Sequence, residues 1–312
     1  MKKFIALYPI ALICLLASLT GCEKNSKELV NKYPEDTLYW HYIQRPVSDT
    51  VIWDSIRVVR FGNQVWTAHE RPWDNNSNNR PWPEANIKRV TKSNWPIYHR
   101  PNPQQDKTAL FFRYKHNANY PYHTGYTNWK NDMYNWYAIM GEDEADAHRL
   151  CPPGFHVPTA SEWDQLEYYL TWRNTYFAEK SGSIANALAS VAGLDWGDEG
   201  GPHTWHYSDI QHTPGYNWAD NNSAHFNVYP TGTVDYKITG EDNNRDTAIC
   251  IQGAGRMAVY ATSTESPAGK DMYTTRIFYY NSPLIGKGAL DKSRFARVRC
   301  IKDDNTINKT KE

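Results

Sequence analysis

The sequence has no excess of charge of either sign. Its 312 residues include 34 Lys and Arg and 34 Asp and Glu, without a block of consecutive basic residues. Proteins that attract nucleic acid through charge usually carry a basic patch or a positive net charge. The composition therefore gives no reason to expect nucleic acid as a partner.

Motifs that mark common enzyme classes are absent from the sequence as well. It contains no nucleophile elbow, no phosphate-binding loop and no dinucleotide-binding fingerprint. Isolated Ser, His and Asp residues form no local constellation. We predict no catalytic residue and no cofactor, so an enzymatic activity has no support in the sequence.

Long apolar runs are limited to one, Phe4–Leu19, which follows two lysines and is short for a stable membrane span. This pattern is typical of an export signal. It ends in Leu19-Thr20-Gly21-Cys22, which resembles a lipobox, the bacterial signal for cleavage before a cysteine that then carries lipid. We predict lipid attachment at Cys22. The alternatives are an ordinary secretory peptide and a single membrane span.

A lipid anchor of this kind would hold the protein on a membrane of the bacterial cell envelope without crossing it. Glu23 follows the cysteine, whereas an aspartate at this position is an inner-membrane retention signal in some bacteria. We therefore expect an outer membrane lipoprotein. Residues 1–21 would be the signal peptide, 22–48 a polar tether, 49–303 the domain and 304–312 a polar tail.

Cysteine is scarce, with five in the chain. Cys14 would leave with the signal peptide and Cys22 would carry lipid, so Cys151, Cys250 and Cys300 would remain in an oxidising compartment. One disulfide is possible, with one thiol left over.

Aromatic residues, in contrast, are abundant, with 13 Trp and 22 Tyr. We expect a core that rests on rings, with many others partly exposed. Two long stretches, 70–108 and 193–225, are rich in aromatic and polar residues and lack a helical period, so we interpret them as loops.

The clearest local signal lies in residues 150–170, LCPPGFHVPTASEWDQLEYYL. Thr159 precedes Glu162 by three residues, the spacing of a capping box at a helix start. The apolar residues Trp163, Leu166 and Leu170 then follow at helical spacing. We predict a helix with these three side chains buried, and we interpret His156 as packed or hydrogen-bonded rather than catalytic.

Elsewhere the pattern is that of short strands. Gly62-Asn63 between two β-rich runs predicts a hairpin, and residues 184–191 suit a second short helix. Further strands are expected at 226–229, 248–251, 257–262, 274–280 and 295–301. In the last, Ala296, Val298 and Cys300 share one face, and Arg297 and Arg299 share the other. Helices followed by several antiparallel-looking strands indicate an α+β domain.

Several of these pieces, in this order, resemble the Fibrobacter succinogenes major paralogous domain family of exported bacterial proteins. The block from Leu150 to Trp163 is the most specific match. The remaining pieces are FGNQVW at 61–66, YNWYA at 134–138, FNVYPTG at 226–232, YATST at 260–264 and RVRCIKD at 297–303. The chain departs from the family in two places. His69-Glu70-Arg71 stands where members usually have Asn-Leu, and Tyr-Ala-Thr-Ser-Thr replaces a Trp-Ser-Ser-Thr-like strand.

The family is distantly similar to C-type-lectin-like folds, including that of sulfatase-modifying enzymes. The resemblance implies a twisted antiparallel sheet with two helices, long irregular loops and chain ends that lie close together. It also implies a Cys151–Cys300 disulfide, with Cys250–Cys300 as the second choice. The tripeptides of calcium-dependent lectins are absent, so calcium lectin chemistry is not expected.

Two other kinds of site were weighed. His203, His206 and His212 lie near several carboxylates and could be metal ligands, but an irregular loop fixes no geometry, and we predict no metal site. The aromatic residues of the second loop are the candidate ligand-binding residues, because exposed rings suit sugar faces or extended peptides. They are Trp196, Trp205, Tyr207, Tyr216 and Trp218. The alternative is that these rings pack the loop onto the domain.

The sequence thus predicts a lipid-anchored bacterial envelope protein that acts as a binding or adhesion module for a glycan or a surface protein. This expectation rests on fold analogy. The alternatives are an envelope enzyme of the sulfatase-modifying type, which would depend on Cys250, and a purely structural envelope component.

Overall fold

The computed structural model describes residues 37–47, 50–68, 88–90, 109–113, 132–141, 150–172, 184–191, 194–195, 202–203, 205–239 and 246–303. All of them belong to one unit, Thr37–Glu312. The signal peptide with Cys22, most of the loop at 70–108, Trp196 and the polar tail lie outside the described residues. None of the helices in the described ranges is both long and apolar enough to span a membrane.

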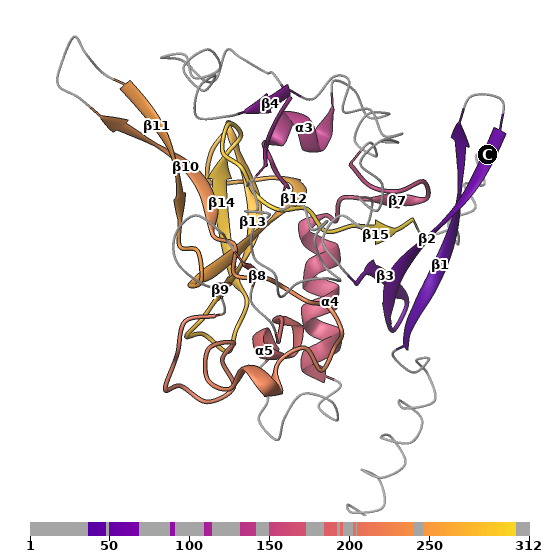
Figure 1. Cartoon of the computed structure of the whole chain (residues 1–312), viewed down its shortest axis with the longest axis horizontal. Coiled ribbons are helices and arrows are strands. Elements are labelled where there is room, and N and C mark those ends of the chain that lie inside the picture. Colours follow the sequence, from indigo (N-terminus) through magenta and orange to yellow (C-terminus); the bar gives the residue numbers. More distant parts are fainter. Residues whose placement is uncertain are drawn as a thin grey trace, which may run out of the picture. The chain divides into compact units, whose positions relative to one another are not determined.

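The largest sheet joins the first described strands to the last one (Figure 1). Its order is β1 (Thr37–Val47), β2 (Thr50–Phe61), β3 (Gln64–Thr67), β15 (Ile301–Lys302) and β7 (Phe155–His156), and every pair is antiparallel. Ile301 pairs with Trp66 on one side and with His156 on the other. Segments from the start, middle and end of the domain therefore meet in one sheet.

The predicted hairpin is present between β2 and β3. Gly62 has a φ of +58°, the left-handed conformation that a tight turn requires and that glycine adopts at little cost. The strand β1 was not predicted. Its residues, assigned above to the tether, pair along their whole length with β2.

The remaining strands form smaller sheets. β12 (Met257–Glu265), β13 (Met272–Tyr279) and β14 (Gly286–Asp291) make an antiparallel sheet, and β10 (Thr233–Thr239) pairs with β11 (Asp246–Gln252). β4 (Lys88–Val90) runs parallel to β5 (Leu110–Arg113), which pairs with β6 (Asp132–Tyr134). β8 (Leu194–Asp195) pairs with β9 (Pro202–His203). The described part is therefore a sheet-rich α+β structure whose strand pairs are mostly antiparallel.

Helix α4 (Ala160–Trp172) is the longest helix in the described residues and begins where the capping box predicted. The backbone N–H of Thr159 donates to Glu162 Oε2 over 2.7 Å, and the N–H of Glu162 donates to Thr159 Oγ1 over 3.2 Å. Trp163, Leu166 and Leu170 are buried, as the helical spacing predicted. The helices α3 (Trp136–Met140) and α5 (Ala185–Leu188) are shorter.

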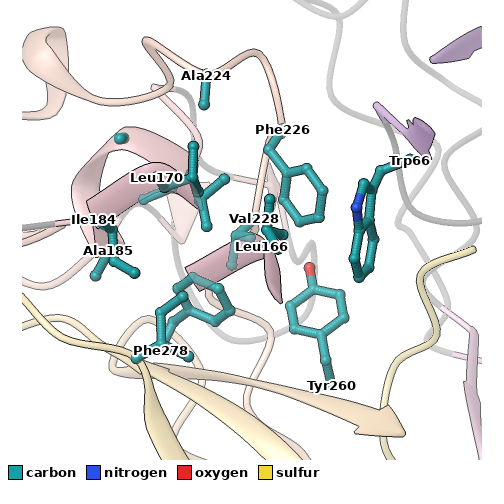
Figure 2. Close-up of a cluster of buried hydrophobic side chains, with 14 of the residues drawn as sticks. Trp66, Leu166, Leu170, Ile184, Ala185, Ala224, Phe226, Val228, Tyr260 and Phe278 are labelled. Atoms are coloured by element: carbon teal, nitrogen blue, oxygen red, sulfur yellow. The ribbon is translucent and has the colours of Figure 1, made fainter. Parts of the chain in front are cut away.

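Trp163 lies at the centre of a buried aromatic cluster. Its ring centroid is 4.9 Å from Trp66, 6.0 Å from Phe226 and 5.9 Å from Tyr260. Figure 2 shows Trp66, Phe226 and Tyr260 converging from three separate segments, with Leu166 and Leu170 of α4 beside them. Tilted and edge-on ring pairs of this kind add about 0.5–1.5 kcal/mol each beyond area burial. The expected aromatic core is therefore present around the predicted helix.

Several predicted elements are shorter in the structure. The helix expected at 184–191 is limited to Ala185–Leu188, and Ala189 instead forms a single parallel bridge with Val228. Residues 295–301 form isolated bridges before the two-residue strand β15. Neighbouring segments pair with single residues of 295–297, so the backbone does not form a continuous strand there. The side chains of 295–301 are nevertheless buried.

Candidate binding loop

The described part of the second predicted loop, residues 205–225, is called the aromatic loop below. It follows β9 and carries four of the five candidate ligand-binding residues. Its regular structure is confined to the 3-10 turn η3 (Trp218–Asp220). The conformation of the loop therefore depends on specific hydrogen bonds.

The base of the aromatic loop is fixed by backbone hydrogen bonds to two neighbouring turns. The N–H of His206 donates to Gly255 O over 2.7 Å, and that of Gly215 donates to Tyr280 O over 2.8 Å. The N–H of Ser208 donates across the loop to Gly215 O over 3.0 Å. A Cβ at position 215 would lie 2.1 Å from His206 O, so this close approach requires glycine.

Buried polar side chains fix the interior of the loop. The Asn221 amide donates to Ser190 O over 3.1 Å and to Pro214 O over 2.9 Å, which ties the loop to the residues that follow α5. The Thr213 hydroxyl donates to Ile210 O over 2.8 Å. Both side chains are buried, where a lost hydrogen bond costs about 1–3 kcal/mol. The loop therefore has one preferred arrangement.

Unusual backbone conformations are concentrated in this region. All four non-glycine residues with positive φ in the described chain lie between positions 212 and 227. They are His212 at +64°, Asn222 at +63°, His225 at +55° and Asn227 at +56°. Asn and His enter this region more readily than most residues, and such conformations persist when the surroundings enforce them. Here the Asn222 amide donates to Asn227 Oδ1 over 2.7 Å, and Asn222 Oδ1 accepts from Asn227 N over 2.8 Å.

The candidate rings divide into two groups. The Trp205 side chain is only 1% exposed and belongs to the aromatic core, so it has the packing role that was weighed as the alternative. Tyr207, Tyr216 and Trp218 are 71%, 41% and 39% exposed. Trp196 lies outside the described residues. The exposed surface of the aromatic loop thus carries three of the predicted rings.

The backbone indicates how these three rings are arranged. Because the N–H of Ser208 donates to Gly215 O across the loop, the backbones next to Tyr207 and Tyr216 lie close together. Asn217, between Tyr216 and Trp218, is extended, with φ −140° and ψ 104°. The three exposed rings therefore belong to two backbone segments that approach each other.

Sequence reasoning missed two exposed apolar side chains, one in the aromatic loop and one in a turn that contacts the loop. Ile210 lies in the aromatic loop and Leu284 in the turn after β13, and both are exposed. The backbone of that turn contacts the loop through Tyr280 O. The signal in the sequence was a large apolar residue within a polar turn. The sequence could not show that the turn after β13 contacts the loop, because this contact is tertiary.

Among the described residues, no group of three His, Cys, Asp or Glu side chains lies close enough to hold a metal ion. The His206 ring instead meets the edge of Tyr280, with centroids 5.9 Å apart. Asp198 and Glu199, two carboxylates close to these histidines in the sequence, lie outside the described residues.

The chemically richest cluster lies at the start of α4. His156 Nε2 lies 2.9 Å from Glu162 Oε1. Burial alone would lower the pKa of His156, but hydrogen bonds and charge from Glu162 and Asp303 outweigh it and raise the pKa above its usual 6.5. Burial likewise would raise the pKa of Glu162, but His156 and Thr159 lower it overall. Both ring nitrogens face carboxylates, which fits the interpretation of His156 as a hydrogen-bonded structural residue.

Cys151 and Cys300 form a disulfide with Cα atoms 5.7 Å apart, the pair that the family resemblance implied. It joins the segment before α4 to the residue before β15. The backbone places Cys250 in β11, opposite Asp235 of β10.

Comparison with known protein families identifies the wider group. The family model of the Fibrobacter succinogenes major domain matches residues 59–302, well over half of the chain. The chain belongs to this family. The match includes α4, the disulfide and the aromatic loop, and it begins near the end of β2, so β1 precedes it. Neither the curated proteins nor the solved structures include a significant match.

Proposed function

We propose that this member of the Fibrobacter succinogenes major domain family is a lipid-anchored protein of the bacterial cell envelope that binds a glycan or protein ligand through the aromatic loop. The observation that carries the proposal is the exposure of Tyr207, Tyr216 and Trp218 on a loop whose own hydrogen bonds fix its backbone. Rings on a fixed backbone contribute contact area at low entropic cost, because little is left to order on binding.

The C-type-lectin-like fold forms part of the proposal. Three features support it: antiparallel sheets with short helices, a disulfide from the helix start to the last strand, and pairing of β3 with β15 near the two ends of the domain. An experimental structure that superposes on C-type-lectin-like domains over α4, α5 and these strands would establish it. A different strand order would contradict it.

The lipid anchor is supported by the lipobox at Leu19–Cys22. Labelling bacteria that express the full chain with radioactive palmitate should mark the protein, and Cys22→Ser should abolish the label. Cys14→Ser is the matched control within the apolar run and should keep it. Protease treatment of intact cells then reports the membrane face, since only an outward-facing domain is cleaved.

The binding role is tested by adhesion of bacteria that display the protein. Immobilised mucin offers a glycan-rich surface, and immobilised fibronectin offers a protein-rich one. Replacement of Tyr207, Tyr216 and Trp218 by Ala should abolish adhesion to whichever surface the wild type binds. The control replaces Tyr168 and Trp172, two exposed rings of α4, and should adhere like the wild type. Equal adhesion of the loop variant and the wild type would overturn the proposal.

A further inference from the structure

The first observation concerns the charge of the segment that contains the aromatic loop. From residue 181 to residue 236 the sequence contains no Lys or Arg, whereas Asp209 and Asp220 lie in the loop and are exposed. The neighbouring turn contributes one exposed base, Arg256. An anionic ligand would therefore face two carboxylates against one guanidinium, which is unfavourable for acidic sugars, phosphates and nucleic acid.

The second observation concerns the backbone of the loop. Peptides that bind in extended form usually add a strand, for which the receptor must offer free backbone N–H and C=O groups. Here about half of the N–H groups of the loop already donate within the protein. They are those of His206, Ser208, Ile210, Gly215, Tyr216, Ala219, Asp220, Asn221, Asn222, Ala224 and His225. These groups are not available to an added strand, which favours recognition by side chains.

The third observation is the chemistry of the exposed side chains. Tyr216 and Trp218 are both exposed, and their Cα atoms are separated by about 6–7 Å because Asn217 between them is extended; the backbone next to Tyr207 approaches that next to Tyr216. The loop also carries the exposed polar side chains of Asp209 and Gln211. Pyranose rings present C–H faces that stack on such rings, and their hydroxyls both donate and accept, as amides do.

From these three observations we infer that the ligand of the aromatic loop is an uncharged glycan, held by stacking on Tyr216 and Trp218 and by hydrogen bonds to the neighbouring polar side chains. The inference rests on the proposed binding role of the loop and narrows it to one ligand class. It assigns the stacking to two exposed rings that a single extended residue separates.

The test is native electrophoresis of the full-length protein in detergent, through gels that contain a polysaccharide. Glucomannan, xyloglucan and amylopectin serve as neutral probes, and polygalacturonate and chondroitin sulfate as anionic ones. We expect at least one neutral probe to retard the wild type, without an effect of EDTA or added salt, since no charge pair contributes. The double variant Tyr216→Ala, Trp218→Ala should lower the affinity at least tenfold.

Two control variants separate the possible outcomes. Trp172→Ala removes a more exposed ring from α4 and should leave retardation unchanged. Retardation only by anionic probes, weakened by salt and by Arg256→Gln, would overturn the neutral-glycan inference but leave the loop as the binding surface. Neutral binding that survives the double variant would overturn the role of the loop and with it the proposed function. Retardation by none of the neutral probes would overturn the inference alone, since adhesion tests the binding role separately.

Discussion

Nδ1 of His156 lies 2.6 Å from Oδ1 of Asp303, the last described residue, while Nε2 of the same ring faces Glu162 at the start of α4. The N–H of Asp303 also donates to Gly154 O over 2.8 Å. One titratable side chain therefore connects β7, the end of β15 and the helix start. The stability of this corner of the domain should depend on pH.

The expected pH dependence follows from the two shifted pKa values. The pKa of His156 is higher in the folded protein than its unfolded value of 6.5. Its protonation therefore stabilises the folded state below pH 6.5, and this contribution is lost as the pH rises through the folded pKa. The pKa of Glu162 is lower in the folded protein than its unfolded value of 4.5. Its ionised form therefore stabilises the folded state above pH 4.5, and this contribution is lost as the pH falls through the folded pKa. The melting temperature of wild type should therefore exceed that of His156→Gln most clearly between pH 4.5 and 6.5.

A second variant separates charge from packing at this corner. Glu162→Gln keeps the size of the side chain but removes the carboxylate, so the pKa of His156, followed by NMR of its ring protons, should fall. The melting curves of wild type and His156→Gln should approach each other at alkaline pH. A constant difference over the whole pH range would show that the ring acts through packing alone.

The disulfide predicts a selective effect among the cysteines. Cys151 and Cys300 are 149 residues apart, and closing so long a loop restricts the unfolded chain. On the chain-entropy model its removal costs about 4–5 kcal/mol, or roughly 10 °C in melting temperature. Calorimetry of Cys151→Ser should show this loss, whereas Cys250→Ser should melt close to wild type. The opposite ranking would assign the bridge to Cys250.

Arg276 predicts a second stability effect. This buried guanidinium of β13 donates to Asp164 Oδ1 over 2.5 Å, to Glu167 Oε1 over 2.7 Å and to Ala160 O over 2.8 Å, which holds the first turns of α4 on the sheet. Arg276→Ala should cost about 3 kcal/mol, because it removes the guanidinium that pairs with Glu167, whose side chain is only 16% exposed. Arg276→Lys should not recover the lost stability, since an ammonium cannot make the same forked contacts.

The control for Arg276 is the neighbouring Lys287, whose ammonium lies 2.7 Å from Asp164 but is largely exposed. Exposed ion pairs contribute at most about 1 kcal/mol. Urea unfolding should therefore show a large shift of the midpoint for Arg276→Ala and a small one for Lys287→Ala. Equal shifts of the urea midpoint would mean that the buried Arg276 stabilises the fold no more than the exposed Lys287 does.

The features that could be predicted from the sequence were those with local causes. The capping box of Thr159 and Glu162, the buried face of α4 and the turn at Gly62 each depend on residues within a few positions of one another. The family motifs added one long-range fact, the Cys151–Cys300 pair. These elements set the α+β character and the centre of the core.

The features that could not be predicted depend on contacts between distant segments. The sequence of β1, TLYWHYIQRPV, has no clear period, and its strand form comes from pairing with β2. The residues around Arg276 do not distinguish it from an exposed strand residue, and only the carboxylates of α4, more than a hundred positions earlier, explain its burial. In the aromatic loop, composition identified the rings but did not separate Trp205 from Tyr207.

Trp205 and Tyr207, two positions apart, should therefore respond in opposite ways to the same substitution. Trp205→Ala removes a fully buried ring from the core and should cost about 3–5 kcal/mol in unfolding free energy. Tyr207→Ala removes an exposed ring and should stay within about 0.5 kcal/mol of wild type. Its effect should appear instead as reduced adhesion of intact cells. Chemical denaturation separates these two roles. If Trp205 acted at the surface instead of in the core, Trp205→Ala would unfold like wild type and would lose adhesion.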